Sequence, residues 1–283
     1  MKKFMDENFL LSTNTAKTLY HSYAADMPIV DYHCHVSAKE IFEDKRFENI
    51  TQVWLGGDHY KWRVMRSNGV DERFITGDAT DFEKFQKFAE ALPKAIGNPM
   101  YHWCHLELKK YFGYNGVLSA DTAKEVWDLA VAKLKESQMS VRGLIEQSNV
   151  AFIGTTDDPT DNLEWHIKIK EQGTLKTVVA PSFRPDKAFN IDKAGWKEYI
   201  SSLSSVCGIK INSLESLKAA LRDRMNFFDS VGCKASDHGL DFMVYCPADE
   251  KTVDKIIKKG LAGKTVTATE AEMLKTELLQ FCG

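Results

Sequence analysis

The sequence predicts an α/β protein with a parallel sheet, on the basis of three observations. Short apolar runs at 28–33, 150–155 and 177–180 have the length and composition of buried strands. Segments with helical spacing of apolar residues separate these runs, and such alternation indicates a parallel sheet. A histidine pair stands at the end of the first run, the position at which active sites of (β/α) barrels are built.

The elements before the second strand are predominantly helical. Asn14 or Thr15 can cap a first helix, which we expect to extend to about Ala25. After the first strand, further helices are predicted from Asp81, from the capping residues Ser119 and Thr122, and over 141–147. Because 36–149 is far longer than a simple crossover needs, we expect a mostly helical insertion after the first strand.

The rest of the chain has a regular rhythm. We expect a helix at 161–171, the strand at 177–180, helices around Trp196 and at 213–228, a strand at 237–240 or 240–245, and two final helices, the last at 267–281. We expect residues 1–283 to form a single domain. Four or five strand–helix units are fewer than the eight of a closed barrel, and an open doubly wound sheet would also fit them.

The bulk composition excludes several classes of protein. Charged residues make up 27% and hydrophobic residues 43%, as in ordinary globular proteins, and the net charge of -3 gives no reason to expect nucleic acid or an anionic membrane as a partner. No apolar stretch approaches transmembrane length, and acidic residues interrupt the N-terminal segment, which makes a poor signal peptide. The six scattered cysteines predict free thiols and a cytoplasmic location.

His33 and His35 are the predicted metal ligands. In a strand, residues two apart point to the same face, so both imidazoles would converge while Cys34 turns away. Neutral imidazole is a good ligand for a borderline divalent metal, and zinc is our first expectation. Two histidines without a metal are the alternative.

Other candidate residues lie in short polar segments. The run 54–63 combines aromatic residues with His59, Tyr60, Lys61 and Arg63, which predicts a substrate wall with an acid/base group, or else an amphipathic turn. Arg184 follows the third strand, where a guanidinium can bind a carboxylate with two hydrogen bonds.

Three further segments have weaker claims. His102 and His105 share one helix side, and we favour packing over metal binding for them. The acids at 157–161 can act in a site or cap the next helix, and His238 is a modest site candidate.

Together these segments resemble the uronate isomerase (glucuronate isomerase) family of the amidohydrolase superfamily. The matching strings, in order along the chain, are DENFLL (6–11), DYHCH (31–35), WL (54–55), GDHYKWR (57–63), HW (102–103), HLEL (105–108), TTDDP (155–159), PSFRPDK (181–187) and SDHG (236–239). So many long and unusual strings in one order make the resemblance specific, and it covers the chain from residue 6 to its last residue.

The resemblance implies a (β/α)₈ barrel of the metal-dependent hydrolase type, a divalent metal and a hexuronate substrate. The expected reaction is aldose–ketose isomerisation, D-glucuronate to D-fructuronate or D-galacturonate to D-tagaturonate, through an enediol. Members of the family continue beyond residue 283 with an aspartate metal ligand, a nearby arginine and another histidine. We therefore expect this chain to be an incomplete barrel, and the full-length member to be a homo-oligomer.

The resemblance also suggests roles for the candidates. His59 and Tyr60 are the expected acid/base residues, Arg184 the expected carboxylate anchor, with Lys61 and Arg63 as further substrate contacts, and His33 and His35 the metal ligands. Two alternatives remain: a metal-dependent hydrolase of the same superfamily, whose nucleophile would be metal-bound water, and an inactive barrel fragment.

Overall fold

The structure is a computed structural model that describes residues 4–283. The chain forms two compact units. Unit 1 consists of 43–149 with the described part of 1–28, and unit 2 consists of Ile29–Phe42 and Val150–Gly283. The predicted metal ligands and Arg184 therefore belong to unit 2, whereas the 54–63 segment belongs to unit 1.

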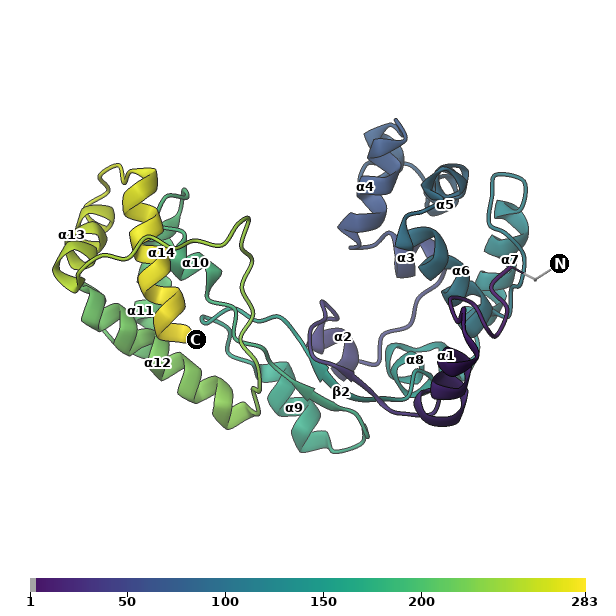
Figure 1. Ribbon diagram of the computed structural model, residues 1–283, viewed down its shortest axis with the longest axis horizontal. Helices are drawn as coiled ribbons and strands as arrows, with labels where there is room; N and C mark the ends of the chain where they lie inside the picture. Colours follow the sequence, from purple (N-terminus) through teal and green to yellow (C-terminus); the bar gives the residue numbers. More distant parts are fainter. Residues whose placement is uncertain (1–3) are drawn as a thin grey trace. The chain divides into compact units, whose positions relative to one another are not determined.

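Unit 1 is helical (Figure 1). Its elements are α1 (Asn14–Leu19), the π-helical η1 (Tyr20–Ala24), α3 (Ile50–Trp54), α4 (His59–Ser67), η2 (Glu72–Phe74), α5 (Asp81–Ala91), η3 (Leu92–Ala95), α6 (Pro99–Phe112), α7 (Ala123–Leu134), η4 (Ser137–Met139) and α8 (Val141–Gln147). The helix predicted at 141–147 is confirmed. The first helix is shorter than expected as an α-helix, since it continues as η1 from Tyr20.

Local sequence explains the central helix of unit 1. Thr80 and Glu83 form a capping box at the start of α5 and thereby satisfy two backbone N–H groups. Phe85 and Phe88 are fully buried on one side of this helix, in a cluster with Trp54, whose ring centroid lies 5.8 Å from that of Phe88. The three-residue spacing of the phenylalanines thus marks the buried face of α5.

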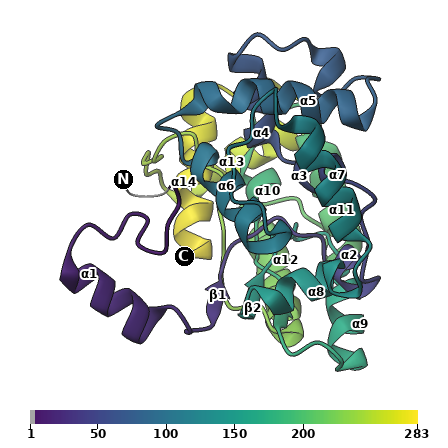
Figure 2. The same cartoon turned by 90° about the vertical axis from the view of Figure 1, so that its right-hand side faces the viewer.

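Unit 2 contains a parallel sheet of three strands in the order β1 (Ile29–Asp31), β2 (Val150–Gly154) and β3 (Val178–Ala180). Val30 pairs with Phe152, which pairs in turn with Val178. Figure 2 shows β1 and β2 side by side. The predicted parallel α/β arrangement is confirmed, but residues 4–283 form three strands rather than a barrel.

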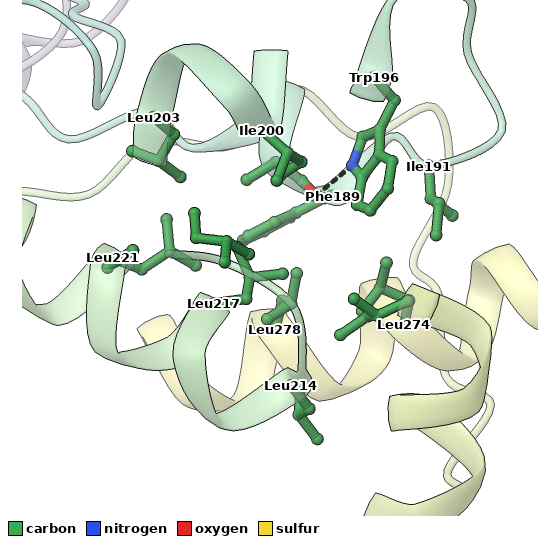
Figure 3. Close-up of a cluster of buried hydrophobic side chains, with 14 of the residues drawn as sticks. Phe189, Ile191, Trp196, Ile200, Leu203, Leu214, Leu217, Leu221, Leu274 and Leu278 are labelled. Atoms are coloured by element: carbon green, nitrogen blue, oxygen red, sulfur yellow. Dashed lines mark hydrogen bonds between the residues drawn. The ribbon is translucent and has the colours of Figure 1, made fainter. Parts of the chain in front are cut away.

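The helices of unit 2 surround a second core. They are α2 (Ala38–Phe42), α9 (Glu164–Gln172), α10 (Asp186–Phe189), α11 (Trp196–Cys207), α12 (Leu214–Val231), α13 (Glu250–Leu261) and α14 (Ala268–Cys282). Leucines of α12 and α14 pack against Phe189 and Trp196 (Figure 3). The indole N–H of Trp196 donates to the carbonyl of Ala188 at 2.9 Å, so the buried polar atom of the ring is satisfied.

The strand predicted at 237–240 or 240–245 is wrong. Between α12 and α13 the described residues contain no strand, although Ser236 forms an isolated parallel bridge with Phe183. Phe242, Met243 and Tyr245 are exposed. The apolar and aromatic residues of 240–245 are typical of a strand, but a strand also needs a neighbouring backbone to pair with. Between residue 237 and α13 the structure records no such pairing.

The helices around that segment are close to expectation. α14 begins one residue after the predicted start, with Thr267 as its N-cap, and α12 begins after the cap Ser213. The mostly helical insertion at 36–149 stays a prediction, although the elements assigned within 32–149 are all helices.

Candidate active site

The candidate residues of unit 2 gather at the carboxyl edge of its sheet. Backbone hydrogen bonds extend the sheet beyond the assigned strands: the N–H of Cys34 donates to Gly154, that of Asp157 to Ser182, and that of Asp237 to Phe183, at 2.9–3.1 Å. Four chain segments therefore end side by side, and their side chains share one edge as in other parallel sheets.

A glycine permits the close approach of the first two segments. A Cβ atom added to Gly154 would lie 2.6 Å from the carbonyl oxygen of Tyr32, whose backbone leads into His33. Any larger residue at position 154 would therefore push the histidine segment away from β2.

His33 and His35 lie next to each other, as the spacing predicts. Their ring centroids are 5.1 Å apart and the rings meet edge to face at 86°. Nδ1 of His33 lies 3.5 Å from Oδ2 of Asp237, and His35 lines a cavity of about 320 Å³ together with Asp157, Asp161 and His166. Cys34 stands between these two histidines in the sequence. Burial raises the pKa of its thiol to about 11, so the thiol is protonated at neutral pH.

Arg184 is held by two carboxylates. Its Nε donates to Oδ2 of Asp186 at 2.8 Å, and its Nη1 lies 3.1 Å from Oδ2 of Asp237. The bond to Asp186 raises the pKa of the guanidinium, which therefore stays charged. Asp186 also accepts the N–H of Gly239, and a side chain at position 239 would collide with the guanidinium.

Two buried polar atoms at this edge have no hydrogen-bond partner among the described residues, namely Oγ of Ser182 and Nδ1 of His238. His238 stacks on Phe189 with centroids 5.6 Å apart, and burial lowers its pKa. Unpartnered buried polar atoms are costly and uncommon, so their concentration at one edge marks a place built to meet a ligand or ordered water.

A buried cluster lies behind the second segment. The Thr155 hydroxyl donates to Oδ2 of Asp157 at 2.6 Å and lies 2.7 Å from Nε2 of His166 on α9. Burial lowers the pKa of His166 and raises that of Asp157. His166 is not among the residues predicted from the sequence, in which its one signal is its place on the helix that follows the TTDDP string.

Unit 1 holds the other candidates on α4. The Asp58 carboxylate caps this helix by accepting the N–H groups of Tyr60 and Lys61. This cap places His59 and Tyr60 in the first turn, with ring centroids 4.4 Å apart. The guanidinium of Arg63 lies 5.5 Å from the centroid of the Tyr60 ring, which is 57% exposed.

Tyr60 and Arg63 face a cavity of about 820 Å³ within unit 1. Other lining residues include Asn98, Trp103 and Lys94. Aromatic and cationic side chains thus line this cavity, and the substrate wall expected of the 54–63 segment stays a prediction.

Lys61 has a different environment from its neighbours. It is 7% exposed, and its Nζ donates to Oδ2 of Asp58 at 2.7 Å. Burial by itself would lower the pKa of Lys61, but the nearby Glu107, Cys104 and Asp58 raise it overall. The predicted substrate contact of Lys61 stays a prediction, while this ion pair gives the residue a structural role.

His105 is a structural histidine, as favoured from sequence. Its Nε2 accepts the N–H of Leu118 at 2.9 Å, which places the ring proton on Nδ1, where it is donated to the Tyr101 carbonyl at 2.6 Å. Both ring nitrogens are thus used inside unit 1. His102 packs against the Phe9 ring, with centroids 5.0 Å apart.

The described residues offer only part of a metal site. No group of three or more His, Cys, Asp or Glu side chains within 4–283 is arranged to hold a metal ion. His33 and His35 supply two imidazoles, whereas zinc in catalytic sites has three protein ligands. The two histidines therefore fit part of a metal shell.

Comparisons with known proteins agree with one another. A family profile described as glucuronate isomerase matches residues 1–283. The chain is 58% identical to the uronate isomerase of Lachnospira eligens and 56% identical to that of Lachnoclostridium phytofermentans, over 283 residues in each case. These matches cover 100% of the chain but 60% and 61% of the relatives, so the chain spans about three-fifths of their length.

Two crystal structures are also similar. Uronate isomerase from Thermotoga maritima superimposes with a TM-score of 0.92 at 36% identity, covering 100% of this chain and 62% of that one. Glucuronate isomerase from Caulobacter crescentus superimposes with a TM-score of 0.89 at 24% identity, covering 99% of this chain and 60% of that one, and supports the fold alone.

None of the helices described here is long and apolar enough to cross a membrane.

Proposed function

We propose, from the premise that this chain belongs to the glucuronate isomerase family, that it serves the aldose–ketose isomerisation of hexuronates. D-glucuronate and D-galacturonate are the proposed substrates, and D-fructuronate and D-tagaturonate the products. The supporting observation is the carboxyl edge in unit 2, where a charged arginine, an imidazole pair and two unpartnered buried polar atoms occur together.

Isomerisation moves a proton between C1 and C2 of the sugar. The reaction needs an acid/base group that removes and returns this proton, a means of stabilising negative charge on oxygen, and an anchor for the C6 carboxylate. A cis-enediol is the natural intermediate, because a single group can then serve both carbons.

We assign these tasks to the candidate residues of the two units. In unit 1, His59 and Tyr60 are the proposed acid/base residues, with Arg63 and Lys61 as substrate contacts. In unit 2, Arg184 is the proposed carboxylate anchor, supported by its permanent charge and its two bracing carboxylates.

His33 and His35 are the proposed ligands of a divalent metal, with zinc as the first choice. When bound, such an ion would act as a Lewis acid toward substrate oxygens. A closed (β/α)₈ barrel, a homo-oligomeric state and a cytoplasmic location belong to the same proposal, for which the family membership is the support.

Binding of the carboxylate tests the proposal directly. Saturation-transfer NMR would compare D-glucuronate with D-glucose, which lacks the C6 carboxylate, on this chain. We expect preference for D-glucuronate, lost in Arg184→Met and kept in Arg73→Met, a matched change at an exposed arginine in unit 1. Equal binding of both sugars by the unmodified chain would contradict the proposal.

A further inference from the structure

The segment 155–157 connects the two parts of the unit 2 site. On one side, the hydroxyl of Thr156 donates to the carbonyl of Cys34 at 3.0 Å, between the two predicted metal ligands. On the other side, the carbonyl of Asp157 accepts the N–H of Arg184 at 2.9 Å. Any displacement of this segment would therefore shift the backbone of the histidine pair and of the arginine together.

A buried hydrogen-bond chain holds the same segment from behind. It runs from Nε2 of His166 to the hydroxyl of Thr155 at 2.7 Å, and from that hydroxyl to Oδ2 of Asp157 at 2.6 Å. The Thr155 hydroxyl has a second, longer acceptor in the carbonyl of Ala180 at 3.3 Å. Because its single proton goes to one of these two oxygens, the proton between His166 and Thr155 comes from Nε2 of His166. Oδ2 of Asp157 also accepts the N–H of Ser182 at 3.3 Å.

The residues of this hydrogen-bond chain are shielded from water. Thr155 and His166 are 3% and 4% exposed, so water does not readily replace a lost partner. The charged groups that face His166 are Asp157 and Asp161, and burial keeps the imidazole neutral by lowering its pKa. Neutral His166 with its proton on Nε2 donates one directed hydrogen bond into the segment.

We propose that His166 is a positioning residue which, through Thr155 and Asp157, fixes the backbone carrying both the His33–His35 pair and Arg184. His166 does not touch substrate in this account. The consequence of this positioning for turnover rests on the proposed function.

Two substitutions of His166 separate the hydrogen bond from the presence of a bulky side chain. His166→Gln keeps an N–H donor at the position of Nε2, whereas His166→Leu removes it. Thr155→Val breaks the same hydrogen-bond chain by removing the hydroxyl at nearly constant volume. It keeps the test valid if the His166→Leu protein does not fold. His21→Leu, at an exposed histidine of unit 1, is the control.

Amide hydrogen exchange is the first measurement, made on the 283-residue chain itself. We expect the N–H groups of Asp157 and Arg184 to exchange about five- to tenfold faster in His166→Leu and Thr155→Val, the effect of losing one buried hydrogen bond. His166→Gln should restore protection. The Leu118 amide in unit 1 should not change. Unaltered exchange at Asp157 and Arg184, or the same acceleration at all amides, would overturn the proposal.

Kinetics provide the second measurement, in a protein in which this chain replaces the matching 283 residues of the Lachnospira eligens uronate isomerase. His166→Leu should raise KM for D-glucuronate severalfold, with rescue by His166→Gln, because Arg184 is misplaced. If His166 had a purely structural role, His166→Leu would lower the fraction of active protein, and therefore the apparent kcat, at constant KM. That result would contradict a positioning role. If the unsubstituted graft has no turnover, the proposed function fails, while the exchange result still decides the structural statement.

Discussion

Nη1 of Arg184 lies 3.1 Å from Oδ2 of Asp237, and the same carboxylate oxygen lies 3.5 Å from Nδ1 of His33. One aspartate thus faces both the proposed carboxylate anchor and a proposed metal ligand. The three residues come from three different segments of the sheet edge. Asp237 belongs to the SDHG string, in which His238 is the residue predicted from the sequence.

Asp186 is expected to stabilise unit 2 through Arg184. Asp186→Ala removes the acceptor for Nε of Arg184 and for the N–H of Gly239. Since charge-assisted bonds of this kind contribute roughly 1.5–3 kcal/mol each, we expect the free energy of unfolding to fall by at least ~1.5 kcal/mol in urea denaturation. Asp241→Ala, at an exposed aspartate, should change it by less than about 0.5 kcal/mol. Equal effects of the two changes would contradict this account of Asp186.

His33 and His35 are expected to bind a divalent metal weakly in this chain. Elemental analysis after dialysis against low zinc should show reduced occupancy in His33→Ala and His35→Ala, but not in His21→Ala. Stoichiometric zinc in both site variants would rule out these ligands.

Lys61 is expected to act mainly on stability. Lys61→Met leaves Glu107 and the Asp58 carboxylate without their cation; burial already raises the pKa of Glu107, and Lys61 opposes this effect. We expect thermal unfolding to show a loss of roughly 1–3 kcal/mol. Lys124→Met removes a comparable but exposed helix pair and should cost less than about 0.5 kcal/mol. A wild-type Tm in Lys61→Met would show that the buried pair contributes nothing.

His105 gives unit 1 a predictable pH dependence. Burial lowers its pKa below the ordinary value of 6.5, so the unfolded chain binds a proton that the folded chain does not. The resulting stability is fully present above pH 6.5 and falls as the pH drops from 6.5 toward the folded pKa. His105→Gln lacks this titration, so we expect its unfolding free energy to depend less on pH in that interval. Parallel pH curves for the two proteins would contradict the assignment.

Local sequence patterns predicted the helices, because capping residues and apolar spacing lie within the helix itself. The 141–147 helix matches α8, and the phenylalanine spacing at 82–88 correctly placed α5. The strand predicted at 237–240 or 240–245 is wrong because local composition does not show whether a neighbouring backbone is present to pair with it.

The candidate site shows the same limit. The adjacency of His33 and His35 follows from their spacing and was predictable. The contacts of Arg184 with Asp237, and of His166 with Thr155, join residues 53 and 11 positions apart, respectively, through the fold. The burial of Lys61 was also unpredictable, because a lysine between His59 and Arg63 is ordinarily exposed.

Turnover of D-glucuronate by the graft into the Lachnospira eligens uronate isomerase tests the central claim most directly. The account predicts formation of D-fructuronate, followed by NMR, with Tyr60→Phe lowering kcat at nearly constant KM and Arg184→Met mainly raising KM. Tyr23→Phe, at an exposed tyrosine of unit 1, should leave both constants unchanged. Two results would contradict the proposed isomerisation. One is a graft that unfolds at the Tm of the relative but forms no ketose; the other is a graft whose turnover does not change in Tyr60→Phe and Arg184→Met.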